Sequence, residues 1–383
     1  MKVAVTILIT CVAGLLALGM VMLYSSSMAQ VGTHYLVKQL AGCALGLALC
    51  VGATALDYRG LRKAAWPLFA VGVVLLMMVF VPHIGIHRNG ASRWLGYGRT
   101  SLFQASEVVK ITLLIALAWY CERYQRQMPT LKRGLIIPGL FVGLVLGLIF
   151  KEPDVGTMLL LASVSGMMLL IAGVRLRYFL PPVIIGALAV GLFIYHNPMR
   201  SERVYSWMHL EETKQGKGLQ AYQAMVALGS GGFDGKGLGD GRQKLGWVPE
   251  HHTDFIFSII GEELGLIATF LVLCAFAAIV FCGIWIARNA SDPFGLILGS
   301  GITFLIGLQA IINIGVVTSA LPNKGLPLPF ISYGGSNLAI MLLCVGILLS
   351  IARHGRIGDS PVVVPARNAE FNDPNPFKAR NAK

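Results

Sequence analysis

Residues 250–254, Glu-His-His-Thr-Asp, place four ionisable side chains directly before the apolar run 255–260. Only 13% of the chain is charged, and charged groups beside an apolar membrane segment are costly, so the cluster favours a functional role. A carboxylate partly withdrawn from water beside histidines is suited to general-base catalysis, and we expect Asp254 to take that role. A structural role is the alternative, since Thr253 or Asp254 could cap the helix that follows.

The composition predicts an all-α polytopic membrane protein. The 383 residues are 55% hydrophobic with a mean hydropathy of +0.70, and the apolar runs are longer than the helices of a soluble core require. Helices satisfy every backbone group internally, as a lipid environment demands. About ten transmembrane helices are predicted, near residues 4–24, 37–56, 64–82, 104–120, 135–150, 154–173, 178–196, 264–286, 294–318 and 335–352.

Lysine and arginine residues follow the second, fourth, sixth and eighth spans, which assigns these loops and both termini to the cytoplasm. The long loop between spans seven and eight, residues 198–253, is therefore extracytoplasmic. The net charge of +13 reflects this topology and an anionic inner leaflet, so we expect no nucleic-acid partner. The seven cysteines show no Cys-x-x-Cys spacing, so neither disulfides nor a thiolate metal site is expected.

Residues 1–356 are predicted to form one transmembrane domain, and residues 357–383, rich in proline and asparagine, a disordered cytoplasmic tail. Two outer segments of the domain differ from ordinary connectors. The 198–253 loop has apolar anchors, some at helical spacing, and is predicted to contain a helix at the membrane interface. Residues 321–336 are apolar but too rich in proline and glycine to be helical, which membrane depth tolerates only where protein or a cavity covers the backbone.

Other charged residues converge on the predicted outer face. Glu107 and Lys110, at i and i+3 in span four, can pair, and the pair is either structural or functional. Arg93 lies in an outer loop that the positive-inside rule prefers uncharged, and an anionic ligand would explain it. Glu262 and Glu263 are expected to bind loop backbone or a basic partner rather than to do chemistry.

The glycine-rich run 229–241 could wrap a phosphate with its backbone amides, assisted by Lys244. This signal is weak because flexible hairpin loops look alike, and no Walker or dinucleotide pattern is present. Asp154, at the start of span six, either adds an acid to this face or caps that helix. Seven of the eight histidines lie in or near outer segments. A divalent cation, Mg²⁺ or Mn²⁺, could bind there beside carboxylates, but no spacing specifies its ligands.

Several sequence strings closely resemble the SEDS family of cell-wall glycosyltransferases, in the family's order and over roughly residues 10–355. They are Gly-Gly-Phe-Asp-Gly-Lys-Gly-Leu-Gly at 231–239, Gln-Lys-Leu-Gly-Trp-Val-Pro-Glu-His-His-Thr-Asp-Phe-Ile-Phe at 243–257, Ile-Gly-Glu-Glu-Leu-Gly at 260–265 and Leu-Pro-Leu-Pro-Phe-Ile-Ser-Tyr-Gly-Gly-Ser at 326–336. Residues 260–265 and 321–325 look more like the division branch of the family than the elongation branch, with sporulation paralogues next. Gln-Ala-Ser before Glu107 departs from the usual Gln-Pro-Ser, and His251 stands where alanine is common.

The resemblance implies a polymerase that joins lipid II into β-1,4 glycan strands on the outer face of the bacterial cytoplasmic membrane during division, releasing undecaprenyl pyrophosphate. Asp254 matches the family's essential aspartate, which is implied to deprotonate the acceptor's 4-hydroxyl. We assign substrate contacts to Arg93, Glu107, Lys110, Lys244, Glu250, His252, Lys324 and Ser336. The implied partners are a class B penicillin-binding protein transpeptidase and other divisome proteins at the septum.

Two transport functions are the alternatives. A lipid II flippase or other lipid transporter would use the same cavity and broken segments. A proton-coupled transporter would place its ionisable residues near the bilayer midplane, whereas here they gather at the outer edge. That placement favours chemistry at the membrane surface over transport.

Overall fold

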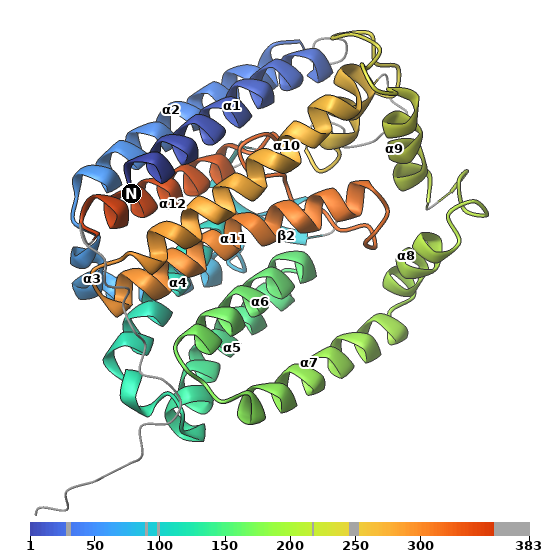
Figure 1. Cartoon of the computed structure of the whole chain (residues 1–383). Helices are drawn as coiled ribbons and strands as arrows, with labels where there is room; N and C mark the ends of the chain where they lie inside the picture. Colours follow the sequence, from blue (N-terminus) through green and yellow to red (C-terminus); the bar gives the residue numbers. More distant parts are fainter. Residues whose placement is uncertain (28–31, 89–90, 98–99, 217, 245–252, 356–383) are drawn as a thin grey trace, which may run out of the picture.

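The computed structural model describes residues 1–27, 32–88, 91–97, 100–216, 218–244 and 253–355, and within them the chain is mainly helical (Figure 1). The helices are α1 (Lys2–Ser27), α2 (His34–Ala55), α3 (Leu61–Met78), α4 (Ala105–Arg123), α5 (Ile137–Lys151), α6 (Val155–Ile171), α7 (Leu176–His196), α8 (Pro198–Met208), α9 (Leu219–Ser230), α10 (Ile256–Arg288), α11 (Pro293–Val317) and α12 (Gly335–Arg353). Three short strands complete the fold: β1 (Gly85–Arg88), β2 (Ala91–Tyr97) and β3 (Thr100–Gln104).

All ten predicted spans coincide with helices, and the predicted class, an all-α multi-pass membrane protein, is confirmed. Eight helices of the described chain are long and apolar enough to cross a membrane. The other two are α4, which carries Glu107 and Lys110, and α6, which is only 17 residues long. In the described part of the 198–253 loop, where we expected a helix, the chain forms two, α8 and α9.

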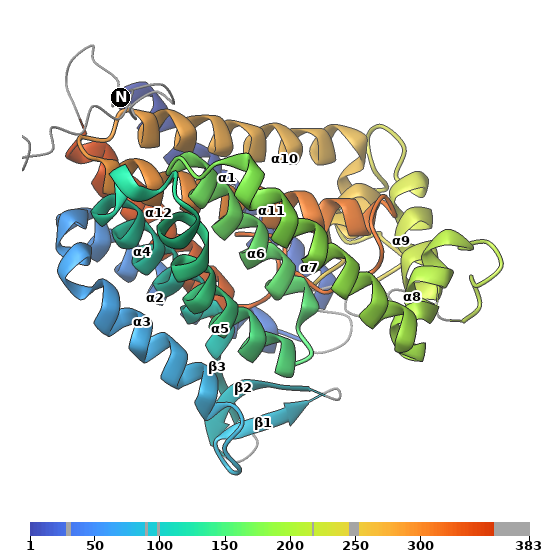
Figure 2. The ribbon, with the colours of Figure 1, turned by 90° about the horizontal axis from the view of Figure 1, so that it is seen from below.

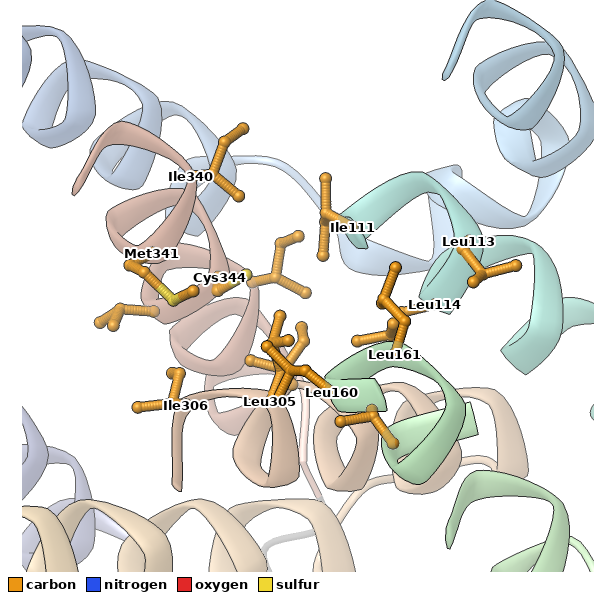
Figure 3. Close-up of a cluster of buried hydrophobic side chains, with 14 of the residues drawn as sticks. Ile111, Leu113, Leu114, Leu160, Leu161, Leu305, Ile306, Ile340, Met341 and Cys344 are labelled. Carbon is orange, nitrogen blue, oxygen red and sulfur yellow. The ribbon is translucent and has the colours of Figure 1, made fainter. Parts of the chain in front are cut away.

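The centre of the bundle is formed by α4, α6, α11 and α12, whose apolar side chains point toward one another (Figure 3). Leu114, Leu161, Leu305 and Met341 are among the buried side chains that these four helices contribute. Nearly every residue of α4 is buried, which explains why its apolar residues do not gather on one face: a helix with neighbours all round needs no polar side. Two charged residues in such a helix must therefore find partners inside the protein.

Helix α10 is broken at Gly265, whose φ of 74° and ψ of −171° are not helical. Glycine is the residue for which positive φ carries no steric cost, and a Cβ here would also collide with the backbone of the glycine-rich loop. The glycine-rich loop provides a hydrogen-bond acceptor for a backbone N–H freed by the break, because the Leu266 N–H donates to the Gly232 carbonyl at 2.9 Å. The segment 256–264 is thus a separate helical piece, as expected from a membrane span that begins near residue 264.

A small antiparallel sheet in the order β1-β2-β3 connects α3 to α4, and Figure 2 shows it beside the end of α3. Its three strands were not predicted from the sequence. Strand β3 leads directly into α4, so the sheet determines where the residues at the start of α4 are placed. Helix α7, which contributes no buried residue, lies beside α5 and α6 and runs out to α8 (Figures 1 and 2).

Candidate active site

A cavity of about 540 Å³ lies beside Asp254 at the predicted outer end of the bundle. Its walls come from α8, from the start of α9, from residues 254–255 and from the proline-rich segment that follows α11. The polar and charged side chains in this wall include Glu202, Arg203, Gln220, Asp254 and Asn323. The cavity therefore combines two carboxylates with a cation and two amides, a set suited to a polar and charged ligand.

Asp254 is half-buried and lies just before the N-cap residue of α10, which is Phe255. Its backbone carbonyl accepts a hydrogen bond from Asn313 Nδ2 of α11 at 2.8 Å. Its carboxylate Oδ2 lies so close to Gly325 that a Cβ at that position would collide with it. Backbone and side chain of Asp254 are thus both confined, and the residue lines the cavity instead of serving as the N-cap residue of α10.

The proline-rich segment is held against the two helices of the outer loop. The indole Nε1 of Trp207 in α8 donates to the Ser319 carbonyl at 2.8 Å. Asn323 Nδ2 donates to Gln220 Oε1 of α9 at 3.3 Å. These contacts join elements that lie about a hundred residues apart in sequence and so maintain the shape of the cavity. As predicted, the segment between α11 and α12 is not helical.

Glu107 and Lys110 form the predicted pair, with 2.7 Å between Glu107 Oε2 and Lys110 Nζ. Both side chains are buried, at 5% and 1% exposure respectively. Asn337 Nδ2 of α12 donates to Glu107 Oε2 at 3.0 Å, and Lys110 Nζ donates to Gln309 Oε1 of α11 at 3.3 Å. Neither charged residue is among the residues that line the cavity.

The glycine-rich loop binds two carboxylates of the protein itself. Glu263 Oε2 accepts from the Gly239 N–H at 3.1 Å, and the two carboxylate oxygens of Glu262 accept from the N–H groups of Arg242 and Gln243 at 3.0 and 3.1 Å. Both glutamates are fully buried. Our expectation that they bind loop backbone or a basic partner is confirmed, and the Gly239 N–H of the run suggested for a phosphate is used by Glu263.

Lys244, which we assigned to substrate binding, is paired within the protein. Its Nζ lies 2.6 Å from Glu263 Oε1 and donates to the Gly239 carbonyl at 2.8 Å and to Ser25 Oγ at 3.0 Å. Its side chain is only 5% exposed. A buried ammonium group requires such a partner, because an unpaired charge away from water is unfavourable. Lys244 therefore joins α1, the glycine-rich loop and α10.

Arg93 holds the turn between α5 and α6. Its Nε donates to the Glu152 carbonyl at 3.2 Å and its Nη2 to the Pro153 carbonyl at 2.9 Å. The next residue, Asp154, is the N-cap residue of α6 and accepts from the Thr157 N–H at 3.2 Å, so the capping interpretation of Asp154 is confirmed. At least two of the Arg93 donors are thus used within the protein.

The Glu152 carboxyl group is buried, and neither of its oxygens has a hydrogen-bond partner among the described residues. Burial, together with the nearby charge of Asp154, raises the pKa of Glu152 to about 8, while Arg93 opposes the shift. At neutral pH this side chain is therefore mainly uncharged. It is an ionisable group beside the site that sequence reasoning did not single out.

Cations gather near the cavity. Lys324 is half-buried between Asn323 and Gly325, both of which line the cavity, and burial and the charge of Arg200 lower its pKa while Asp154 opposes them. The pKa of Arg200 is itself lowered by burial and by the charges of Arg203 and Arg93. Repulsion among neighbouring cations is relieved by a bound anion. Arg200 and Arg203 were missed, although they violate the positive-inside preference in the same way as Arg93.

We also assigned three further residues, Ser336, Glu250 and His252, to substrate contacts. Ser336 is half-buried in the first turn of α12 and is not among the cavity-lining residues. Glu250 and His252 lie outside the described residues, as do His251 and the predicted tail. In the part of the chain that the structure describes, no group of three or more His, Cys, Asp or Glu side chains could hold a metal ion.

Fold and site together define a multi-pass membrane protein with a carboxylate and cations around a cavity at one end of its bundle. The sequence model of the cell cycle protein family FtsW/RodA/SpoVE matches residues 5–357. The chain therefore belongs to this family.

Relatives and a solved structure agree with this assignment. The "Probable peptidoglycan glycosyltransferase FtsW" of Geobacter metallireducens is 38% identical over 340 residues, which cover 87% of this chain and 90% of that protein. "Stage V sporulation protein E" of Bacillus subtilis is 35% identical over 351 residues, 89% of this chain and 95% of that protein. A solved peptidoglycan synthase complex, described as coordinating polymerization and crosslinking, contains a chain that aligns with a TM-score of 0.74 at 27% identity, covering 90% of this chain and 96% of that one.

Proposed function

We propose that this protein is a peptidoglycan glycosyltransferase that polymerises lipid II into β-1,4 glycan strands on the outer face of the bacterial cytoplasmic membrane. The observation that carries the proposal is Asp254, a confined carboxylate in the wall of a polar cavity at the predicted outer end of the bundle. The names of its relatives, peptidoglycan glycosyltransferases, supply the substrate class.

In the proposed reaction Asp254 removes the proton from the 4-hydroxyl of the acceptor sugar. The hydroxyl oxygen forms a bond to the anomeric carbon of the donor chain, while the bond between that carbon and the pyrophosphate oxygen breaks. The electron pair of the broken bond leaves with undecaprenyl pyrophosphate, and attack from the opposite face gives the β-linkage. General-base assistance of this kind contributes roughly 10²–10⁴-fold to a rate.

The negative charge that develops on the leaving pyrophosphate requires cations that are already in place. Arg203 lines the cavity, its charge helps to lower the pKa of Arg200, and the charge of Arg200 helps to lower the pKa of Lys324. We assign the stabilisation of the leaving group to these three residues. Lys110 and Lys244, to which we assigned substrate contacts, are paired with Glu107 and Glu263, and Arg93 donates to two backbone carbonyls.

A divalent cation remains part of the proposal, and no step depends on it. Its proposed ligands would include the cavity carboxylates and the histidines of residues 251–252, which lie outside the described residues. Mg²⁺ or Mn²⁺ bound there would supply further charge for the pyrophosphate. Chelation followed by restoration of each metal, with glycan synthesis as the readout, tests this part.

The proposed partners are a class B penicillin-binding protein transpeptidase and other divisome proteins, and the proposed location is the division septum. The structural similarity to a chain of a synthase complex supports a crosslinking partner, and relatives named FtsW support the division branch. A fluorescent fusion that forms septal bands would support this location, whereas dispersed wall patches would favour elongation.

The decisive experiment measures conversion of lipid II to long glycan by purified protein in detergent, with its partner present if required. Detergent removes sidedness, so a flippase would produce no polymer. Asp254→Asn should lower the polymerisation rate by at least about 100-fold at unchanged melting temperature, because the base is lost while the shape is kept. Asp240→Asn, an equally conservative change of an exposed carboxylate in the glycine-rich loop, should have little effect. Undiminished polymerisation by Asp254→Asn would disprove the assignment.

A further inference from the structure

Two side-chain amides on α11, Gln309 and Asn313, lie one turn apart and face the same segment. Gln309 Nε2 donates to the Pro327 carbonyl at 2.8 Å, and Asn313 Nδ2 donates to the Leu326 carbonyl at 2.7 Å. Both side chains are almost completely buried, at 0% and 1% exposure. Spacing of four residues in a helix brings them onto one face, where they meet two successive backbone carbonyls.

These amides satisfy carbonyl groups that the proline-rich segment cannot satisfy by regular structure. The segment has no helical or strand hydrogen-bond ladder at Leu326 and Pro327. A buried carbonyl without a donor is unfavourable by roughly 1–3 kcal/mol, so α11 supplies the missing donors. The segment is therefore placed by α11, and with it Gly325, the residue that touches the Asp254 carboxylate.

Asn313 also contacts the catalytic residue's own backbone. The same Nδ2 that binds the Leu326 carbonyl donates to the Asp254 carbonyl at 2.8 Å. One amide group thereby fixes the distance between the backbone of Asp254 and the segment that confines its carboxylate. Gln309 extends this connection inward, because its Oε1 accepts from Lys110 Nζ at 3.3 Å.

We propose that Asn313 and Gln309 are positioning residues that hold Asp254 in its reactive place and connect it to the buried Glu107–Lys110 pair. The inference rests on the proposed function, since it gives a role to residues around the proposed base. It also gives the ion pair a role without substrate contact: Lys110 orients the Gln309 amide, and that amide orients the segment beneath the cavity.

The test replaces each amide by an apolar side chain of similar size, Asn313→Leu and Gln309→Met, in the full-length protein with its partner. We expect kcat for glycan synthesis to fall by roughly 30- to 100-fold, the effect of displacing a catalytic group by about 1 Å, with the KM for lipid II changed much less. Thr303→Val is the matched control, because Thr303 is equally buried on α11 and donates only within its helix, to the Gly299 carbonyl at 2.7 Å.

A double variant separates positioning from general stability. If Asn313 acts through Asp254, adding Asn313→Leu to Asp254→Asn should lower the rate little further, whereas independent effects would multiply. Unchanged kcat in both single variants would overturn the inference. So would the loss of folded protein in both, because the amides would then maintain the fold rather than the site.

Failure of the proposed function would look different. Wild-type protein would form no polymer, or Asp254→Asn would remain active. Active wild-type protein, inactive Asp254→Asn and fully active amide variants would reject the positioning role alone.

Discussion

The carboxylates of Glu262 and Glu263 lie within ten residues of the Asp254 carboxylate in the sequence, but their environments differ. Glu262 and Glu263 are fully buried, and their oxygens accept from backbone N–H groups, a hydroxyl and two ammonium groups. Asp254 is half-buried, its backbone carbonyl accepts from Asn313, and its side chain lines a cavity. A carboxylate whose acceptor sites are filled by the protein serves the structure, whereas one that lines a cavity can accept a proton from a ligand.

The largest expected effect tests the structural side of this comparison. Glu263→Ala removes the partner of a buried ammonium group, and breaking such a pair lowers the free energy of unfolding by about 3–5 kcal/mol. Thermal unfolding in detergent should show a large decrease in melting temperature, with loss of folded protein at physiological temperature. Adding Lys244→Met should restore part of the stability, because no unpaired charge then remains. If Glu263→Ala left the melting temperature unchanged, Glu263 would not have the structural role that distinguishes it from Asp254.

A smaller effect tests the catalytic side. In Gly325→Ala the new Cβ would collide with Asp254 Oδ2, which is the mobile end of a side chain and can move aside. We therefore expect about a tenfold lower rate of glycan synthesis with little change in melting temperature, since a displaced base loses alignment while the core is untouched. Gly229→Ala on α9 is the control, because a Cβ there meets no atom within 4 Å. Full activity of Gly325→Ala would show that the carboxylate is not confined at this contact.

The smallest effect concerns Glu152, a buried carboxyl group that has neither the donors of Glu263 nor the cavity position of Asp254. Its pKa rises from the ordinary 4.5 to about 8 in the folded protein, so the folded state binds the proton more tightly than the unfolded state. The contribution of Glu152 to stability is then fully present below about pH 4.5 and is lost as the pH rises toward about 8. Glu152→Gln should reduce the decline in melting temperature between about pH 5 and 8. An identical decline in both proteins would contradict the raised pKa.

Much of the fold could be predicted because long apolar runs are a local signal. Each predicted span was found as a helix, and the break at Gly265 lies where the predicted eighth span begins. The sheet was missed although the sequence between its first two strands, Asn89-Gly90, is a strong hairpin signal. Its strands are short and lie between two long apolar spans, and the strong hydropathy signal of those spans conceals the weaker signal of the strands.

The candidate site was predicted less completely. Asp254 stood out because it is charged in an apolar setting, and the same signal marked Glu107 and Lys110 without distinguishing their roles. Gln309 and Asn313 are uncharged and lie in an apolar span, so they passed unnoticed, although two amides at i and i+4 in such a helix are themselves a signal.

The sequence by itself determined the membrane class, the helices and the side of the bundle on which charged residues gather. Only the tertiary structure decided which of those charges are already paired. Ser25 meets Glu263, Asn337 meets Glu107, and Gln309 meets Lys110 across roughly two hundred residues of chain. The physical reason is that hydropathy is a property of neighbouring residues, whereas a hydrogen-bond partner is supplied by whichever segment packs nearby. The chemical availability of a carboxylate is therefore known only once the helices are assembled.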